Sequence, residues 1–217
     1  MGDHWEGQLS GPNNPGLGPV VFLDRDGVLT APVIDSRSDQ PESPYRPEDV
    51  RLMGGAAAAL RVLRGIGATL VLVSNQPAAA KGTCSLADLD AVHAEFSRLL
   101  AAEGLQLDVV RYCHHHPEAT VPALRGPCAC RKPAPGLLVD AVRDLGLTDF
   151  RATWMIGDSD VDIAAGKRVG ARTILIEEPL SAHRRTGSAE PDHHAPSVLS
   201  AAQIVADAVG RPRPEDA

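Results

Sequence analysis

The stretch "VVFLDRDGVLT", residues 20–30, decides the fold expected of this chain. Its first four residues are apolar without polar alternation, which is typical of a strand buried on both faces of a parallel sheet. Asp24 and Asp26 follow directly, and in an extended backbone two residues so spaced point to the same side. An EF-hand is disfavoured because Gly27 stands fourth from Asp24, not sixth. The stretch therefore predicts either a plain turn or a pair of reactive carboxylates at a strand end.

The alternation of strands and helices continues along the rest of the chain. Buried strands are predicted at 20–24, 69–75, 107–113, 153–158 and 172–178, and helices at 54–67, 85–104, 134–147, 160–170 and 197–209. A long proline-rich loop is predicted at 31–50, and 179–196 is polar and rich in His and Pro. Continuously apolar strands that alternate with helices are typical of an α/β fold, a doubly wound, Rossmann-like parallel sheet.

Length and composition are compatible with one domain. The chain has 217 residues, of which 43% are hydrophobic, enough for a single core. Residues 1–18 are rich in Gly, Pro and Asn and are predicted to be a flexible N-terminal tail. A single domain is predicted over 19–210, followed by a C-terminal tail over 211–217.

Charge and hydropathy restrict the partners of the protein. The formal net charge of −7 argues against a nucleic-acid-binding surface. No apolar run approaches the ~20 residues of a membrane span, and the N-terminus lacks the features of a secretory signal. We therefore expect a cytoplasmic protein without nucleic-acid or membrane partners, and a monomer because no apolar surface stripe stands out. In the cytoplasm, the four cysteines are expected to be metal ligands or free thiols rather than members of disulfides.

Chemically active side chains follow the predicted strands. They are Asp24, Asp26, Ser74, Asn75, Arg131, Lys132 and Asp158, with Asp160 and Asp162 close behind. In folds of this kind ligands bind beyond the carboxyl ends of the strands. Acids, a hydroxyl, an amide and two cations therefore meet at one edge of the sheet, which predicts a site for a divalent metal and a phosphate group.

The acids at this edge suit phosphoryl transfer. Oxygen ligands favour Mg²⁺, and one acid of the pair Asp24 and Asp26 can contact the metal while the other acts nearby as acid or base. A carboxylate can attack phosphorus and form an acyl phosphate. A second carboxyl group can protonate the leaving alkoxide and later deprotonate water, which contributes roughly 10²–10⁴-fold. Fixed cations offset the charge on the transferred group.

The loop "CHHHPEATVPALRGPCAC", residues 113–130, has the spacing of a metal site. Its Cys-x-His and Cys-x-Cys pairs are twelve residues apart and predict a tetrahedral zinc site. The predicted ligands are Cys113, His115, Cys128 and Cys130. Such a closed site would fix the loop next to Arg131 and Lys132. The alternatives are a disulfide from Cys113 to Cys128 or Cys130, free thiols, or His114 or His116 as a ligand.

Four stretches, in this order, resemble the motifs of the haloacid dehalogenase (HAD)-type phosphatases. They are "FLDRDGVLT", "LVSNQ", "CRKPAPG" and "MIGDSDVD", and the resemblance covers roughly residues 20–176. It implies that Asp24 is the nucleophile and Asp26 the general acid/base. It also implies that Ser74 and Asn75 hold the phosphoryl oxygens and that Lys132 neutralises Asp24 and the phosphate.

The same resemblance implies a magnesium site and an open active site. Mg²⁺ would be bound by Asp24, the backbone carbonyl of Asp26 and Asp158, and Asp162 would support Lys132 or the metal shell. About 27 residues separate Asp26 from the helix predicted at 54, which is too few for a large helical cap. The chain therefore resembles the capless members, whose open site suits small phosphorylated sugars.

The zinc loop resembles that of one subgroup, the heptose 1,7-bisphosphate 7-phosphatases and histidinol-phosphate phosphatases, and its length is closer to the heptose pattern. The resemblance implies an Mg²⁺-dependent phosphomonoesterase that removes the 7-phosphate of D-glycero-D-manno-heptose 1,7-bisphosphate in nucleotide-activated heptose biosynthesis. Arg131 would contact the substrate, and Lys81 is either a second contact or a solvated lysine. The alternatives are a histidinol-phosphate phosphatase, another small sugar-phosphate phosphatase, or a non-enzymatic zinc-bearing interaction module.

Several positions depart from the subgroup pattern. Thr30 stands where Asn is usual, and Pro77 with three alanines replaces a glycine-bearing loop. Residues 179–217 extend past the last motif. Three histidines lie in the polar part of this extension and are interpreted as solvated rather than as a second metal site; they are His183, His193 and His194.

Overall fold

A computed structural model describes residues 18–35 and 39–210 of the chain. The predictions of tails over 1–17 and 211–217 lie outside the described residues. Within the described residues, six strands form one parallel sheet in the order β5–β4–β1–β6–β7–β8. The strands are β1 Val20–Leu23, β4 Thr69–Asn75, β5 Val109–Cys113, β6 Thr153–Gly157, β7 Arg172–Ile176 and β8 His193–Ala195. The predicted doubly wound sheet is thus confirmed.

Strand β1 lies at the centre of the sheet because both of its faces are apolar. Its register pairs Leu23 with Leu72 of β4 on one side and with Ile156 of β6 on the other. Val21 and Leu23 pack into one hydrophobic cluster, and Val20 and Phe22 pack into the cluster on the opposite face. This alternation follows from the two-residue period of a strand.

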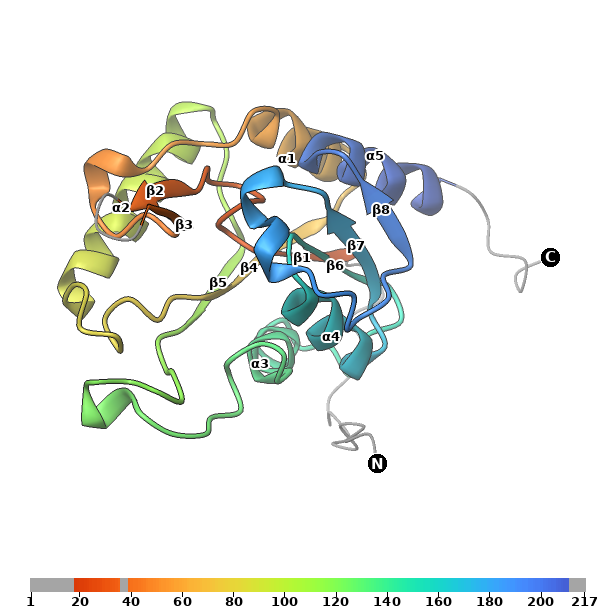
Figure 1. Cartoon of the computed structure of the whole chain (residues 1–217). Coiled ribbons are helices and arrows are strands. Elements are labelled where there is room, and N and C mark those ends of the chain that lie inside the picture. Colours follow the sequence, from red (N-terminus) through yellow and green to blue (C-terminus); the bar gives the residue numbers. More distant parts are fainter. Residues whose placement is uncertain (1–17, 36–38, 211–217) are drawn as a thin grey trace.

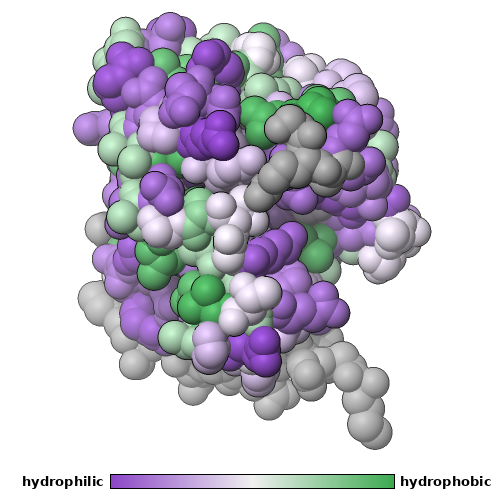
Figure 2. Space-filling model, turned by 60° about the vertical axis from the view of Figure 1, so that its left-hand side comes forward, coloured by the Kyte–Doolittle hydropathy of each residue, from purple (hydrophilic) through white to green (hydrophobic). Residues whose placement is uncertain are grey.

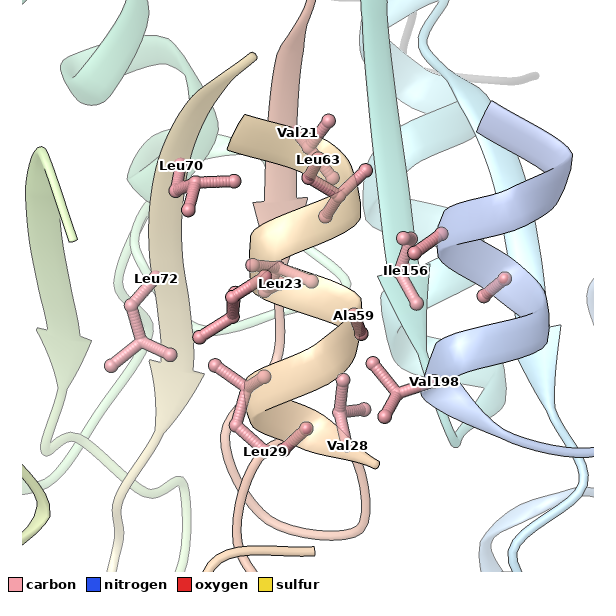
Figure 3. Packing of buried hydrophobic residues seen from close by; sticks show 14 of the residues in the cluster. Val21, Leu23, Val28, Leu29, Ala59, Leu63, Leu70, Leu72, Ile156 and Val198 are labelled. Carbon is pink, nitrogen blue, oxygen red and sulfur yellow. The ribbon is translucent and has the colours of Figure 1, made fainter. Parts of the chain in front are cut away.

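Helices cover both faces of the sheet. They are α1 Ala56–Gly65, α2 Leu86–Ala102, α3 Gly136–Asp144, α4 Asp160–Val169 and α5 Val198–Val209. Residues of α1, α2 and α5 pack into the cluster that holds Leu23, and residues of α3 and α4 into the cluster that holds Phe22. Figure 1 shows α1 and α5 on one side of the sheet and α3 and α4 on the other. Figure 3 shows α1 and α5 over β1, β4 and β6.

Local signals explain where the helices begin and end. Ser85 caps α2 in a capping box, because its hydroxyl accepts a hydrogen bond from the amide of Asp88 while the Asp88 side chain accepts one from the Ser85 amide. Gly170 ends α4 in the left-handed conformation that glycine adopts readily. The predicted helix boundaries are therefore correct to within about two or three residues, and tertiary contacts decide the last turns.

Two predicted irregular segments contain short regular elements. The loop predicted at 31–50 holds the antiparallel hairpin β2 Val33–Asp35 and β3 Gln40–Glu42 and the 3₁₀ helix η1 Pro47–Asp49. The polar stretch 179–196 holds the 3₁₀ helix η3 Pro179–Arg184 and edge strand β8. These elements are short and half-exposed, so they carry no hydrophobic periodicity that sequence analysis could detect.

The order of the strands places a crevice next to β1. The chain runs from β1 outward through β4 to β5 and then returns to β6 on the other side of β1. Ligands bind at such a reversal, beyond the carboxyl ends of the strands. Between β1 and α1, the described residues hold only the hairpin and η1, in line with the predicted absence of a helical cap. Within the described part of the chain, no helix is long and apolar enough to cross a membrane.

Candidate active site and metal centres

The turn after β1 brings the acids of two strands together. The Asp24 amide donates a hydrogen bond to the carbonyl of Ile156 (3.0 Å), which extends the pairing of β1 with β6. Gly27 adopts φ +84°, and a Cβ atom there would lie 2.1 Å from Asp158 Oδ2. Only glycine satisfies both this conformation and this close approach. The predicted pairing of Asp24 with Asp158 at one edge of the sheet is therefore present in the structure.

Lys132 lies among the acids and is fully buried. Its Nζ atom is 2.9 Å from Asp24 Oδ1 and 2.5 Å from Asp162 Oδ1, and it donates a hydrogen bond to the carbonyl of Val73 (2.7 Å). Burial alone would lower the pKa of Lys132, but the charges of Asp162 and Asp24 raise it above its usual range. Lys132 is therefore a fixed cation beside Asp24.

Three buried acids form a second feature of the site, which we name the carboxylate cluster: Asp24, Asp158 and Asp162. Each offers an oxygen, and these oxygens lie within 4.8 Å of one another. Both oxygens of Asp158 are buried and accept no hydrogen bond from a described residue, whereas Asp24 Oδ1 and Asp162 Oδ1 have the ammonium group of Lys132 as their partner. Burial and the charges of Asp24 and Asp162 raise the pKa of Asp158 to about 8.

The carboxylate cluster has the properties of a divalent-cation site. Buried carboxylate oxygens without hydrogen-bond donors are costly unless a cation compensates them. The donors are all hard oxygens, which Mg²⁺ prefers over softer ligands. The residues therefore fit Mg²⁺. Asp162 belongs to this cluster and contacts Lys132 as well, whereas the expected participation of the Asp26 carbonyl stays a prediction.

Asp26 is held by hydrogen bonds from three side chains. Arg25 donates to both carboxylate oxygens (2.9 and 3.1 Å), Thr30 Oγ1 donates to one of them (2.7 Å) and Gln76 Nε2 to the other (2.6 Å). Burial raises the pKa of Asp26, but the charge and hydrogen bonds of Arg25 outweigh burial and leave it lowered. In this arrangement Asp26 is ionised, and it lines the same pocket as Asp24.

Ser74 and Asn75, the predicted phosphoryl-binding pair, end strand β4. Asn75 spans the backbone of Lys132: its Nδ2 donates to the Lys132 carbonyl and its Oδ1 accepts from the Lys132 amide, both at 3.0 Å. Ser74 is buried, and its hydroxyl oxygen accepts a hydrogen bond from Gln76 (3.0 Å), which leaves its own proton free to donate. Asn75 thus orients Lys132, and the contact of either residue with phosphate stays a prediction.

A pocket of about 410 Å³ opens above these residues. Its volume falls in the range of roughly 300–1,000 Å³ that is common for small-molecule sites. Asp24, Asp26 and Lys132 line its floor. The walls include the predicted substrate contacts Lys81 and Arg131, hairpin residues such as Glu42 and Tyr45, and His183 and Arg184 of η3. His183 is exposed, in line with its interpretation as a solvated residue, but it also lines this pocket, which the sequence analysis did not predict.

The predicted zinc ligands also come together, and we name them the thiol–histidine cluster: Cys113, His115, Cys128 and Cys130. All described cysteines are free thiols. Cys113 Sγ is 3.7 Å from Cys128 Sγ and 3.8 Å from His115 Nδ1. Two sulfur ligands 2.3 Å from a tetrahedral zinc ion lie about 3.8 Å apart, so these distances fit zinc. The Cys113–Cys130 distance of 2.8 Å is shorter than this and too long for a disulfide.

The other histidines of this loop have contacts outside the cluster. His114 Nδ1 lies 3.2 Å from the backbone oxygen of Gln76, and His116 Nδ1 accepts a hydrogen bond from the Glu118 amide (3.1 Å). Arg131 follows the cluster directly and donates to the carbonyl of His115 (3.2 Å). The cluster therefore joins the end of β5 to the residues directly before Arg131 and Lys132.

Sequence analysis missed Arg25 and Gln76. Arg25 is almost completely buried and joins Asp26 to Gln76 Oε1 (2.7 Å), while its guanidinium lies 5.7 Å from the centre of the Tyr112 ring. An arginine between two acids directly after a buried strand is a weak signal, because only the folded structure provides its partners. Gln76 gave no signal beyond its place after Asn75.

Comparisons with known proteins point in one direction. A family model described as HAD-hydrolase-like matches residues 129–201. The chain is 35% identical to a D-glycero-beta-D-manno-heptose-1,7-bisphosphate 7-phosphatase of Photorhabdus laumondii over 72% of this chain and 80% of that protein. It is 36% identical to the enzyme of the same name from Rhodopseudomonas palustris over 70% of this chain and 79% of that protein.

A solved structure resembles the whole described fold. It is the D,D-heptose 1,7-bisphosphate phosphatase of B. bronchiseptica complexed with magnesium and phosphate, with a TM-score of 0.73 and 26% sequence identity. The alignment covers 88% of this chain and 99% of that chain. The relative therefore holds magnesium and phosphate on a scaffold similar to that of this chain.

Proposed function

This chain belongs to the HAD-type phosphatases, in the group that includes the heptose 1,7-bisphosphate 7-phosphatases, and we propose that it removes the 7-phosphate of D-glycero-D-manno-heptose 1,7-bisphosphate. One observation carries the chemical part of the proposal: Lys132 Nζ contacts Asp24 while the buried oxygens of Asp158 beside them have no donor. A nucleophile, a fixed cation and a cation-binding carboxylate then lie next to one another. The names of the relatives support the sugar.

In the first half of the reaction, Asp24 attacks the phosphorus atom of the 7-phosphate, and the bond between phosphorus and the sugar oxygen breaks. Lys132 offsets the negative charge that Asp24 and the phosphoryl group bring together. Asp26 gives its proton to the leaving sugar oxygen. Asp26, which is ionised in the free protein, takes up this proton from solvent when the substrate binds, because the nearby charge of the phosphate dianion raises the pKa of its carboxyl group.

In the second half, water attacks the phosphorus atom of the aspartyl phosphate. Asp26 accepts the proton of this water, and inorganic phosphate and free Asp24 are regenerated. The hydrogen bonds from Arg25 and Gln76 support this step, since they favour the ionised form of Asp26. Asn75 keeps Lys132 in place through both halves, because it holds the backbone on either side of that residue.

Two metals complete the proposal. Asp24 and Asp158 would hold Mg²⁺, with Asp162 beside them, and the bound ion supplies charge stabilisation for the phosphoryl oxygens. The thiol–histidine cluster would hold Zn²⁺ in a closed site that fixes the loop before Arg131 and Lys132. The predicted cytoplasmic location, monomeric state and absence of nucleic-acid partners stay predictions.

A comparison of substrates tests the proposed function. Phosphate release is measured with Mg²⁺ for heptose 1,7-bisphosphate and for histidinol phosphate on one preparation. We expect kcat/KM to favour the heptose bisphosphate by about 100-fold, which corresponds to about 2.7 kcal/mol of transition-state binding. Equal values, or a preference for histidinol phosphate, would contradict the proposed substrate. Asp24→Asn serves as the control for contaminating phosphatases.

A further inference from the structure

We infer that Arg184 binds the phosphate that does not react, at a subsite on the pocket wall formed by η3, so that this residue contributes to selection of a bisphosphorylated sugar. The inference rests on the proposed function and deepens it. It concerns a segment past the last motif, which neither the sequence pattern nor the proposed chemistry explains. Four observations carry it: the anchoring of the segment, its place beside Asp158, the unpaired state of Arg184, and the charges of the pocket.

Arg185, the residue directly after η3, anchors the segment that carries Arg184. Arg185 donates hydrogen bonds to the carbonyls of Asp158 (3.2 Å), Ile176 (3.4 Å) and Glu178 (3.0 Å). Arg185 thus ties the end of η3 to the backbone directly after β6 and to the end of β7. Because the side chain of Arg185 makes these contacts, the backbone at Arg184 is held in place without any contact of the Arg184 side chain.

Asp160 anchors the residues that follow η3. One of its carboxylate oxygens accepts four hydrogen bonds, from the amide and hydroxyl of Thr186 (2.8 and 2.9 Å) and of Ser188 (3.1 and 2.9 Å). These bonds lower the pKa of Asp160 despite the opposing effect of burial, so the acceptor stays charged. Asp160 is two residues from Asp158, and the anchoring therefore ties the segment to the loop that carries the carboxylate cluster.

The front of η3 reaches the floor of the active site. Ser181 is buried, and its hydroxyl lies near the Gly27–Asp158 contact, 2.9 Å from the position that a Gly27 Cβ would take. The chain after β7, blue in Figure 1, thus passes beside the carboxyl ends of β1 and β6. Arg184 is close enough for its charge to lower the pKa of Asp158 slightly, against the larger effects of burial and neighbouring acids.

Arg184 is a cation without a protein partner in this pocket. It lines the pocket, is half-buried, and forms no hydrogen bond or ion pair with any other residue in the ranges 18–35 and 39–210. Its neighbour Arg185 by contrast uses its guanidinium on three carbonyls. A half-buried guanidinium that the fold leaves unpaired is suited to a bidentate contact with a phosphate group.

The distribution of charge favours a second phosphate over a neutral or cationic group. Away from the floor, the pocket is lined by three cations, Lys81, Arg131 and Arg184, and by two acids of the hairpin, Asp35 and Glu42. Lys132, by contrast, is already committed to Asp24 and Asp162 at the floor. When one phosphate group lies at Asp24, the cations on the walls remain available for a second phosphate group. A monophosphorylated substrate would leave them without a phosphate contact.

The test measures the preference for the bisphosphate over the 7-monophosphate of the same heptose, as the ratio of the two kcat/KM values. In Arg184→Gln we expect this ratio to fall about 10- to 100-fold, the scale of a lost hydrogen bond to a charged group. The loss is expected mainly in the KM of the bisphosphate. Arg184→Lys keeps the positive charge but cannot donate two parallel hydrogen bonds as a guanidinium group does. Its ratio is expected to lie between those of the wild type and Arg184→Gln.

Arg98→Gln is the matched control, because it removes the same charge from the exposed surface of α2, where Arg98 pairs with Glu95. It is expected to keep the wild-type ratio. A ratio unchanged in Arg184→Gln, or an equal loss on both substrates, overturns the inference while the wild type still prefers the heptose bisphosphate. A wild type that fails to prefer the heptose bisphosphate over histidinol phosphate overturns the proposed substrate and the inference together, so the comparison with histidinol phosphate tells the two failures apart.

Discussion

The carboxylate cluster and the thiol–histidine cluster are both candidate metal sites, but they are built in opposite ways. Asp24 and Asp158 follow the carboxyl ends of central strands and Asp162 lies in the first turn of α4; all three are buried, and Lys132 lies between Asp24 and Asp162. Cys113 ends β5 and is the buried member of the other cluster, whereas His115, Cys128 and Cys130 lie in the loop between β5 and α3 and are partly exposed. One site offers hard oxygens and faces the pocket, and the other offers sulfur and nitrogen away from it.

The difference indicates a division of labour. The sheet and Lys132 hold the carboxylates in place without a metal, and their unused oxygens leave room for an ion that also contacts substrate. The loops of the thiol–histidine cluster have few such supports, so a bound zinc ion would itself supply the structure. Changes in the carboxylate cluster should therefore reduce turnover and spare stability, while changes in the thiol–histidine cluster should mainly lower stability.

The largest expected effect is the loss of turnover in Asp24→Asn. The amide cannot attack phosphorus, and removal of a nucleophile costs on the order of 10⁴–10⁶-fold in kcat. Stability should change little, because burial already disfavours an ionised Asp24 more than Lys132 favours it, and Lys132 keeps its ion pair with Asp162 in this variant. Phosphate release and thermal unfolding followed by circular dichroism check both parts. A variant that is inactive only because it is unfolded would contradict the predicted division of labour.

The next effect is expected in Asp26→Asn, where the leaving oxygen loses its proton donor. The loss of kcat should be about 10²–10⁴-fold, the usual contribution of general acid–base catalysis. Thr30→Val provides the comparison, since it removes a single hydrogen bond to Asp26 and keeps the carboxylate. Its activity should lie much closer to the wild type. Equal losses in the two variants would mean that Asp26 serves the structure rather than the chemistry.

Stability is the property expected to change in Cys128→Ser. The variant should lose zinc and unfold at a lower temperature, and for a chain of this length each kcal/mol lost lowers the melting temperature by about 2–4 °C. Cys84→Ser is the matched control, because Cys84 is a free thiol outside the cluster. It should keep both zinc content and melting temperature. Retention of zinc in Cys128→Ser would show that the ligand set is wrong.

The smallest effect is expected in His116→Ala. His116 accepts a hydrogen bond from Glu118 and lies outside the thiol–histidine cluster, so zinc content should not change. Activity should stay within about 2-fold of the wild type, in line with the small effect of most substitutions away from such sites. Metal analysis of this variant beside His115→Ala distinguishes the two histidines. A loss of zinc in His116→Ala but not in His115→Ala would show that His116, and not His115, is the zinc ligand.

The strands could be predicted from the sequence because they are continuously apolar, and the acids because they follow those strands directly. Asp24 and Asp158 needed only the rule that ligands bind at the carboxyl ends of a parallel sheet. The hydrogen bonds that join Gln76 to Arg25 and Asp26 could not be predicted, since they connect residues about fifty positions apart.

The walls of the pocket were the least predictable part. The hairpin β2–β3 has only three residues in each strand, and polar contacts rather than an apolar pattern hold η3 and the residues after it. Side chains on the face shown in Figure 2 mix hydrophilic and hydrophobic character in small groups, which gives no periodic signal either. For the same reason the position of His183 at the pocket could not be inferred from its polar surroundings.

The most direct test measures zinc content and Mg²⁺-dependent phosphate release for wild type, Asp158→Asn and Cys128→Ser purified side by side. The wild type should contain one zinc ion per chain and respond to Mg²⁺. Asp158→Asn should keep its zinc but lose the response to Mg²⁺, and Cys128→Ser should lose its zinc. Loss of zinc from Asp158→Asn, or full Mg²⁺-dependent turnover in it, would contradict the assignment of the two metals to two separate clusters.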